Sequence, residues 1–148
     1  MKKLLFISTV VFLSCSSKKE YSIPEKLDPI HIQKATEFAK SQFESCKTRN
    51  YIPITKDIAD PWLVRNLTVD VIKESCKEIN EKYGDLVDLK IEQTLIYKKN
   101  YIYRFKAKYS KVNDYCEIRV SSNLDHKFTG LIFKKLWTDA YTKFNPKK

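Results

Sequence analysis

The most regular stretch of the chain is Tyr101-Ile102-Tyr103-Arg104-Phe105-Lys106-Ala107-Lys108-Tyr109. Aromatic and small apolar residues fill every second position, and basic residues fill most of the positions between them. Successive side chains of a β-strand point to opposite faces of a sheet, so this period of two predicts a strand with one apolar face. Because such a face must be covered, the fold is expected to be built around this strand.

Three further runs flank this strand and predict a sheet. Residues 89–97 alternate before it, and residues 116–120 and 128–136 follow it. Turn candidates separate the runs, the clearest being Lys98-Lys99-Asn100. Four strands joined by short connections predict an antiparallel sheet.

The last two strands differ in their expected burial. Within 116–120, apolar positions alternate with two charged positions that are expected to be exposed, Glu117 and Arg119. Within 128–136, apolar residues lie on both faces, which predicts a central or strongly bent strand. Gly130 is expected to mark a bulge or bend in it.

Two helices are predicted upstream of the sheet. Apolar residues recur at steps of three and four across 30–47 and across 68–83, and Gly84 can end the second helix. Asp60-Pro61 predicts a short helical turn over 61–65. This order predicts an α+β fold in which two N-terminal helices pack on a curved antiparallel sheet of about four strands.

Composition sets limits on the class of protein. A length of 148 residues suits one domain, and contents of 43% hydrophobic and 13% aromatic residues exclude general disorder. Only two glycines are present, which excludes glycine-rich and phosphate-loop designs.

The formal net charge of +10 is typical of proteins that meet nucleic acid or an anionic membrane. Arg104, Lys106 and Lys108 lie opposite the aromatic face, whereas a single-strand binder needs cations and aromatic rings on one platform. These residues, with Arg119 beside them, are therefore expected to form a solvated outer face. No nucleic-acid partner is expected.

The N-terminus has the pattern of a secretory signal peptide over residues 1–14. Lys2-Lys3 precedes an apolar run of about ten residues, which ends at the small residue Ser14. This run is too short to cross a bilayer, which needs roughly 20 apolar residues.

Phe12-Leu13-Ser14-Cys15 resembles a bacterial lipobox, in which the cysteine receives diacylglycerol and becomes the mature N-terminus. Phe12 and Leu13 depart from the usual leucine and small residue of that pattern. The alternative is ordinary signal-peptidase cleavage after Ser16. The resemblance implies lipid on Cys15, a membrane partner through that lipid, and a location at the membrane surface of the bacterial cell envelope.

Three segments follow from this interpretation: a signal peptide at 1–14, a polar lipidated tether at 15–29, and a single α+β domain at 30–148. Removal of residues 1–14 takes away Lys2 and Lys3, so the formal charge falls from +10 to +8.

The order of elements also resembles the cystatin-like cone of nuclear-transport-factor-two-like domains. Its residue support is generic: Ala35-Thr36-Glu37-Phe38-Ala39, Lys82-Tyr83-Gly84 and Thr129-Gly130-Leu131, within about 30–141. The resemblance implies a cavity between sheet and helices. Its candidate lining is aromatic, comprising Tyr97, Tyr101, Tyr103, Phe105 and Tyr109. The alternative is that this face forms the core.

Three cysteines remain once Cys15 is assigned to lipid. Cys46 and Cys76 lie on the inner faces of the two helices, so an oxidising compartment would allow a disulfide between them. The alternative is three buried thiols that act as small hydrophobic residues. Cys116 belongs to the buried set of its strand, which favours packing over nucleophilic chemistry.

No metal site, cofactor or catalytic residue is predicted. Cys-x-x-Cys is absent, and the histidines are His31 and His126 alone. Asp125-His126 is an adjacent acid–imidazole pair, yet it lies in a turn, as Asp139 lies near the chain end. The sequence therefore favours a non-enzymatic module that binds a small molecule or a protein. The alternative is an envelope enzyme that uses Asp125, His126 or Asp139 in the cone cavity.

Overall fold

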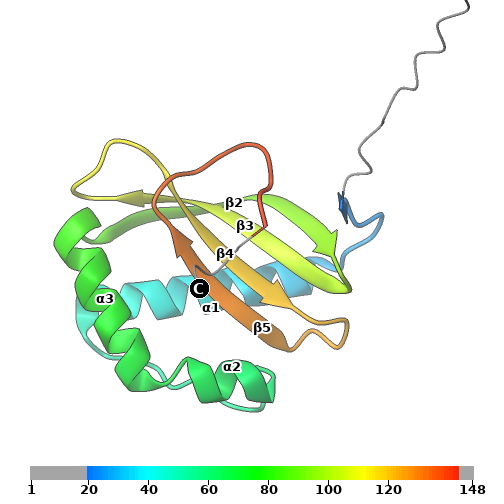
Figure 1. Cartoon of the computed structure of the whole chain (residues 1–148), viewed down its shortest axis with the longest axis horizontal. Helices are drawn as coiled ribbons and strands as arrows, with labels where there is room; N and C mark the ends of the chain where they lie inside the picture. The colour runs from blue at the N-terminus through cyan, green and yellow to red at the C-terminus, as the bar shows by residue number, and fades with distance from the viewer. Residues whose placement is uncertain (1–19, 144–148) are drawn as a thin grey trace, which may run out of the picture.

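The computed structural model describes residues 20–143 and shows an α+β fold (Figure 1). In chain order the elements are β1 (Tyr21–Ser22), α1 (Pro29–Thr48), α2 (Pro61–Asn66), α3 (Val69–Tyr83), β2 (Leu86–Tyr97), β3 (Asn100–Tyr109), β4 (Cys116–Ser122) and β5 (Phe128–Lys134). The predicted fold class is confirmed, but the structure has three helices and five strands instead of two helices and about four strands. Within residues 20–143, no helix combines the length and apolar character needed to cross a bilayer.

The helices begin and end at capping residues. Asp60 and Thr68 accept hydrogen bonds from backbone N–H groups in the first turns of α2 and α3, and the helix start at Asp60-Pro61 was predicted from the sequence. Gly84 ends α3 with a φ of 82°. A Cβ at this position would lie 2.2 Å from the Ser110 Oγ, so both the dihedral angle and the space require glycine.

The sheet is antiparallel, and its strands follow chain order from β1 to β5. A register shift in β2 between Ile91 and Gln93 inserts one residue. Ile91 therefore pairs with Phe105 on the face toward α1, whereas Tyr97 pairs with Asn100 on the other face. The placement of Tyr97 on the aromatic face of β3 was wrong, because the bulge exchanges the two faces of β2.

β1 lies within the segment that was predicted to be a tether, 15–29. Tyr21 pairs with Tyr97 and Ser22 with Ile96, so this part of the chain adds an edge strand beside β2. The Tyr21 ring also packs edge-on against Tyr141 at a centroid distance of 5.3 Å. Tyr21 and Ser22 are therefore part of the sheet.

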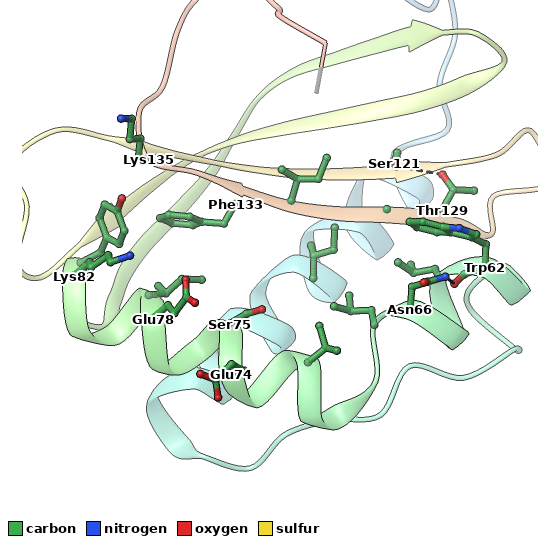
Figure 2. Close-up of a pocket in the computed structure, with 18 residues that line it drawn as sticks. Trp62, Asn66, Glu74, Ser75, Glu78, Lys82, Ser121, Thr129, Phe133 and Lys135 are labelled. Carbon is green, nitrogen blue, oxygen red and sulfur yellow. Dashed lines mark hydrogen bonds between the residues drawn. The ribbon is translucent and has the colours of Figure 1, made fainter. Parts of the chain in front are cut away.

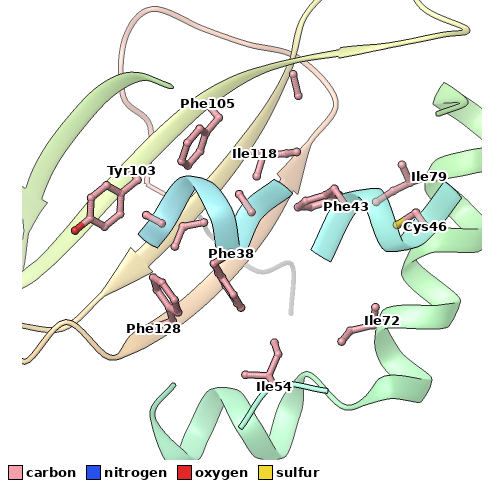
Figure 3. Close-up of a cluster of buried hydrophobic side chains, with 14 of the residues drawn as sticks. Phe38, Phe43, Cys46, Ile54, Ile72, Ile79, Tyr103, Phe105, Ile118 and Phe128 are labelled. Atoms are coloured by element: carbon pink, nitrogen blue, oxygen red, sulfur yellow. The ribbon is translucent and has the colours of Figure 1, made fainter. Parts of the chain in front are cut away.

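The hydrophobic core lies between α1 and the sheet face that carries the odd-numbered residues of β3 (Figure 3). Tyr103, Phe105 and Tyr109 are at most 2% exposed. Phe38 of α1 stacks on Phe128 of β5 with 4.2 Å between ring centroids. The aromatic face of β3 is thus largely core, which was the alternative to a cavity lining.

The opposite face of the sheet is covered by residues 135–143, here called the strap, which cross it after β5 (Figure 1). Arg104 and Arg119 donate hydrogen bonds to the backbone carbonyls of Thr138 and Thr142 at 2.6 and 3.0 Å. Arg104, Glu117 and Arg119 are at most 2% exposed. The prediction of a solvated outer face was wrong at these positions, because the strap buries them.

Candidate functional site: an apolar cleft beside the edge strand

A cleft of about 880 Å³ separates β5 from α2 and α3 (Figure 2). Leu131 and Phe133 line it from the strand, and Val71 and Ile79 line it from α3. Trp62 closes one end from α2 and is 57% exposed. Ligand sites typically occupy about 300–1,000 Å³ and are mostly apolar, so the size and lining of the cleft suit a ligand.

α3 packs mainly against α1 and meets the sheet at its C-terminal end, where Tyr83 contacts Tyr109 and Phe133. Cys46 of α1 and Cys76 of α3 form a disulfide, and the side-chain amide of Asn80 donates to the Cys46 carbonyl at 2.7 Å. These two links join α3 to α1. At one end of the cleft, Tyr83 of α3 packs edge-on against Phe133 of β5 at a centroid distance of 4.9 Å, and the cleft runs along the rest of this side of α3 (Figure 2).

A narrower extension of about 110 Å³ leads from the cleft toward the disulfide. It shares Ser75, Leu131 and Phe133 with the cleft and includes Gln42 of α1 in its lining. Gln42 is 4% exposed; its Nε2 donates to the Ile52 carbonyl at 3.2 Å, while its Oε1 has no hydrogen-bond partner among the described residues. A buried acceptor of this kind would be satisfied by a hydrogen-bond donor in the extension.

β5 is the edge strand beside this cleft. At its start, the Phe128 N–H donates to the Ile58 carbonyl and the Asp60 N–H donates to the Phe128 carbonyl, both at 2.9 Å. Ala59 thereby makes a single parallel bridge to Phe128. Pro61 then begins α2, and no other segment of the described chain pairs with this edge of β5.

Four charged side chains stand at the rim of the cleft: Glu74, Glu78, Lys82 and Lys135. Lys82 and Lys135 lie together at the end away from Trp62 (Figure 2). All four are exposed, and none forms an ion pair with another residue of the described chain. The rim therefore offers a cationic end and an acidic helix flank to a charged ligand.

The five aromatic residues predicted to line a cavity do not line this cleft. Tyr103, Phe105 and Tyr109 lie in the core, and burial, with a smaller contribution from Cys116, raises the pKa of Tyr109. Tyr101 is half-buried, and Tyr97 lies on the opposite face. Tyr83 of α3 is the tyrosine that lines the cleft.

The cysteines occupy distinct environments. Cys46 and Cys76 are joined in the disulfide that the sequence offered as one of two alternatives. Cys116 carries a free thiol that is fully buried in β4, and burial raises its pKa. A buried thiol with a raised pKa is a poor nucleophile, which agrees with a packing role. Cys15 and the signal peptide lie outside the described residues.

Asp125, His126 and Asp139 are not assembled into one site. The His126 ring stacks on His31 of α1, with 3.3 Å between centroids, and on Tyr101 at 5.2 Å. Asp139 lies in the strap across the other face of the sheet, where its Oδ1 accepts from the Trp137 indole. No cluster of three metal-binding side chains occurs among the described residues.

Comparisons with protein-family models, with curated proteins and with solved structures find no match for this chain.

Proposed function

We propose that the protein is a lipoprotein of the bacterial cell envelope that binds a ligand or a partner in the cleft between β5, α2 and α3. The observation that carries this proposal is the cleft itself. It is large and mostly apolar, and the disulfide to α1 fixes the position of the helix that forms one of its walls. An apolar cleft beside an unpaired sheet edge is typical of a binding surface.

The N-terminal sequence and the disulfide support the location. The lipobox-like Phe12-Leu13-Ser14-Cys15 supports a lipid on Cys15, and two or three acyl chains give stable membrane attachment, unlike one. The disulfide between Cys46 and Cys76 suits an oxidising compartment outside the cytosol.

The cleft is tested with the apolar dye anilinonaphthalene sulfonate and two tryptophan substitutions on α3. Ser75 lines both the cleft and its extension, so Ser75→Trp is expected to fill them and to abolish the fluorescence gain of the dye. Lys77→Trp is the matched control, because Lys77 is an exposed residue of the same helix that does not line the cleft. Equal dye binding by both variants would contradict the proposed site.

The anchor is tested by mass spectrometry of the mature N-terminal peptide. The expected peptide begins at Cys15 and carries diacylglycerol. An unmodified peptide that begins at Ser17 would contradict the lipoprotein assignment while leaving the cleft proposal intact.

A further inference from the structure

We propose that the ligand of the cleft is an extended peptide segment of a protein partner, which pairs with the outer edge of β5 as an additional strand. This inference rests on the proposed function and names the ligand class of the same site.

The first argument is the polar edge of β5. A strand at the edge of a sheet presents a row of backbone N–H and C=O groups without partners, and an added strand satisfies them. Beyond Phe128, no segment of the described chain occupies this edge. The edge thus offers main-chain hydrogen bonds directly beside an apolar cleft.

The chain itself pairs with the first residue of this edge. Ile58 and Asp60 exchange two backbone hydrogen bonds with Phe128, both at 2.9 Å, so the beginning of β5 already holds a parallel neighbour. Pro61 then starts α2 and takes the chain away from the sheet. A bound peptide would occupy the line along β5 that the chain leaves at Pro61.

The second argument is the alternation of side chains in a bound strand. Alternate residues of an added strand would point to the helix side of the sheet, where Leu131 and Phe133 of β5 and Ile79 of α3 line the cleft. The intervening residues would point away from α3. The cleft therefore selects peptides with apolar residues at every second position.

The polar edge also decides between a peptide and an acyl chain. Covering β5 with hydrocarbon would bury backbone groups without hydrogen-bond partners, and each such group costs about 1–3 kcal/mol. A peptide covers the same apolar surface and supplies the missing donors and acceptors. The chemistry of the cleft thus favours a peptide.

The charges at the rim of the cleft determine which end of a bound peptide is acidic and which part is basic. Lys82 and Lys135 stand together at one end of the cleft, free of ion pairs with described residues (Figure 2). An acidic side chain or a C-terminal carboxylate of the peptide is expected at this end. Basic side chains are expected near Glu74 and Glu78 of α3.

The experiment uses the Cys15→Ser variant of the chain that begins at residue 15. The probe is a pool of synthetic peptides of 7 residues, the length of β5. The pool carries random apolar residues at alternate positions and random polar or charged residues between them. Bound peptides are expected to have an acidic residue at one end. Their affinity should fall by about tenfold or more in Ser75→Trp and stay unchanged in Lys77→Trp.

Two further measurements test whether the peptide pairs with β5 and whether the rim lysines select its acidic end. Hydrogen exchange should slow at the β5 amides when the best peptide is bound, with no change in β2. Lys135→Glu should remove the preference for an acidic end, because the new carboxylate offsets the charge of Lys82. Lys98→Glu, in the distant β2–β3 turn, should leave the preference unchanged.

The outcomes separate this inference from the proposed function. One outcome is that Ser75→Trp abolishes dye binding but no peptide is enriched. This result would contradict the peptide ligand and support the cleft as a ligand site. Peptide binding without slower exchange in β5 would overturn strand addition. A dimer in sedimentation that Ser75→Trp dissociates would assign the edge to a second copy of the chain. Absence of both dye and peptide binding would contradict both proposals.

Discussion

The Nε of Arg104 donates to the Oε1 of Glu117 at 2.8 Å, and both side chains are completely buried between the sheet and the strap. Arg119 donates to the same carboxylate oxygen at 2.8 Å, so one buried carboxylate serves two buried guanidinium groups. Burial alone would raise the pKa of Glu117, but the hydrogen bonds and charges of Arg104 and Arg119 outweigh it and hold the pKa below its usual value.

Replacing Glu117 is expected to destabilise the fold strongly. Glu117→Gln keeps the shape but leaves two guanidinium groups without a countercharge, and breaking a buried pair in this way costs about 3–5 kcal/mol. Urea unfolding measures the loss. Glu44→Gln is the control, because the Lys40–Glu44 pair is exposed and should contribute less than about 1 kcal/mol. Equal stability of the two variants would contradict a structural role for the buried cluster.

The Trp137 ring is expected to hold the strap on Arg104. The guanidinium lies 4.4 Å from the ring centroid, and a desolvated contact of this kind contributes about 2 kcal/mol. Trp137→Leu should therefore lower the free energy of unfolding and speed hydrogen exchange in β3 and β4. Trp62→Leu, at an exposed position, is the control and should leave stability nearly unchanged. If Trp137→Leu changed neither the free energy of unfolding nor hydrogen exchange, the strap would be held by its backbone contacts alone.

The disulfide is expected to stabilise the fold and to hold α3 in place. The bond spans 30 residues, so its loss in a Cys46→Ser and Cys76→Ser double variant should cost about 3–4 kcal/mol by the loop-entropy estimate. Hydrogen exchange should rise in α3 and remain slow in β3. Before reduction, the chain from residue 20 to residue 143 should contribute a single titratable thiol after denaturation, that of Cys116. A count of three thiols would contradict the bond.

The stacked pair of His31 and His126 is expected to make stability fall in mild acid. Burial lowers the pKa of His126, and the charges of His31 and Lys34 lower it further against the opposing charges of Asp125 and Asp28. The unfolded chain therefore binds a proton at a pH where the folded chain does not. The stabilisation that comes from neutral His126 is fully present above pH 6.5, the usual pKa of histidine. It is lost as the pH falls toward the lower pKa that His126 has in the folded chain.

His126→Asn tests this pH dependence, because asparagine tolerates the φ of 59° at this position. The variant should lose less stability than the parent between neutral pH and mild acid, as measured by urea unfolding at each pH. His31→Asn should have a similar effect, since it removes the stacking partner. Parallel pH profiles for parent and variants would contradict the role of the pair.

Local signals predicted the helices and the central strand. The caps at Asp60 and Thr68 and the glycine at position 84 act within a few residues, so their effects can be read from neighbouring positions. The alternation in 101–109 was also reliable, because the whole strand is covered on its aromatic face. These elements were sufficient to predict an α+β fold.

Features that depend on distant contacts escaped prediction. The bulge in β2 leaves residues 89–97 with an apolar alternation that crosses from one face to the other. Burial of Arg104 and Glu117 depends on the strap, whose hydrogen bonds to Arg104 come from backbone carbonyls and therefore leave no side-chain pattern. The apolar residues on both faces of 128–136 suggested a central strand, but they belong to an edge strand whose inner face lines the cleft.

The sheet order has a consequence for how the protein would stand on a membrane. Six residues lead from Cys15 to Tyr21 of β1, a reach of at most about 20 Å, so a lipid on Cys15 would hold the β1 edge close to the headgroups. β5 is the other edge, four strand spacings or roughly 19 Å away across the sheet. A lipid on Cys15 would therefore attach the domain at the sheet edge opposite the one that borders the cleft.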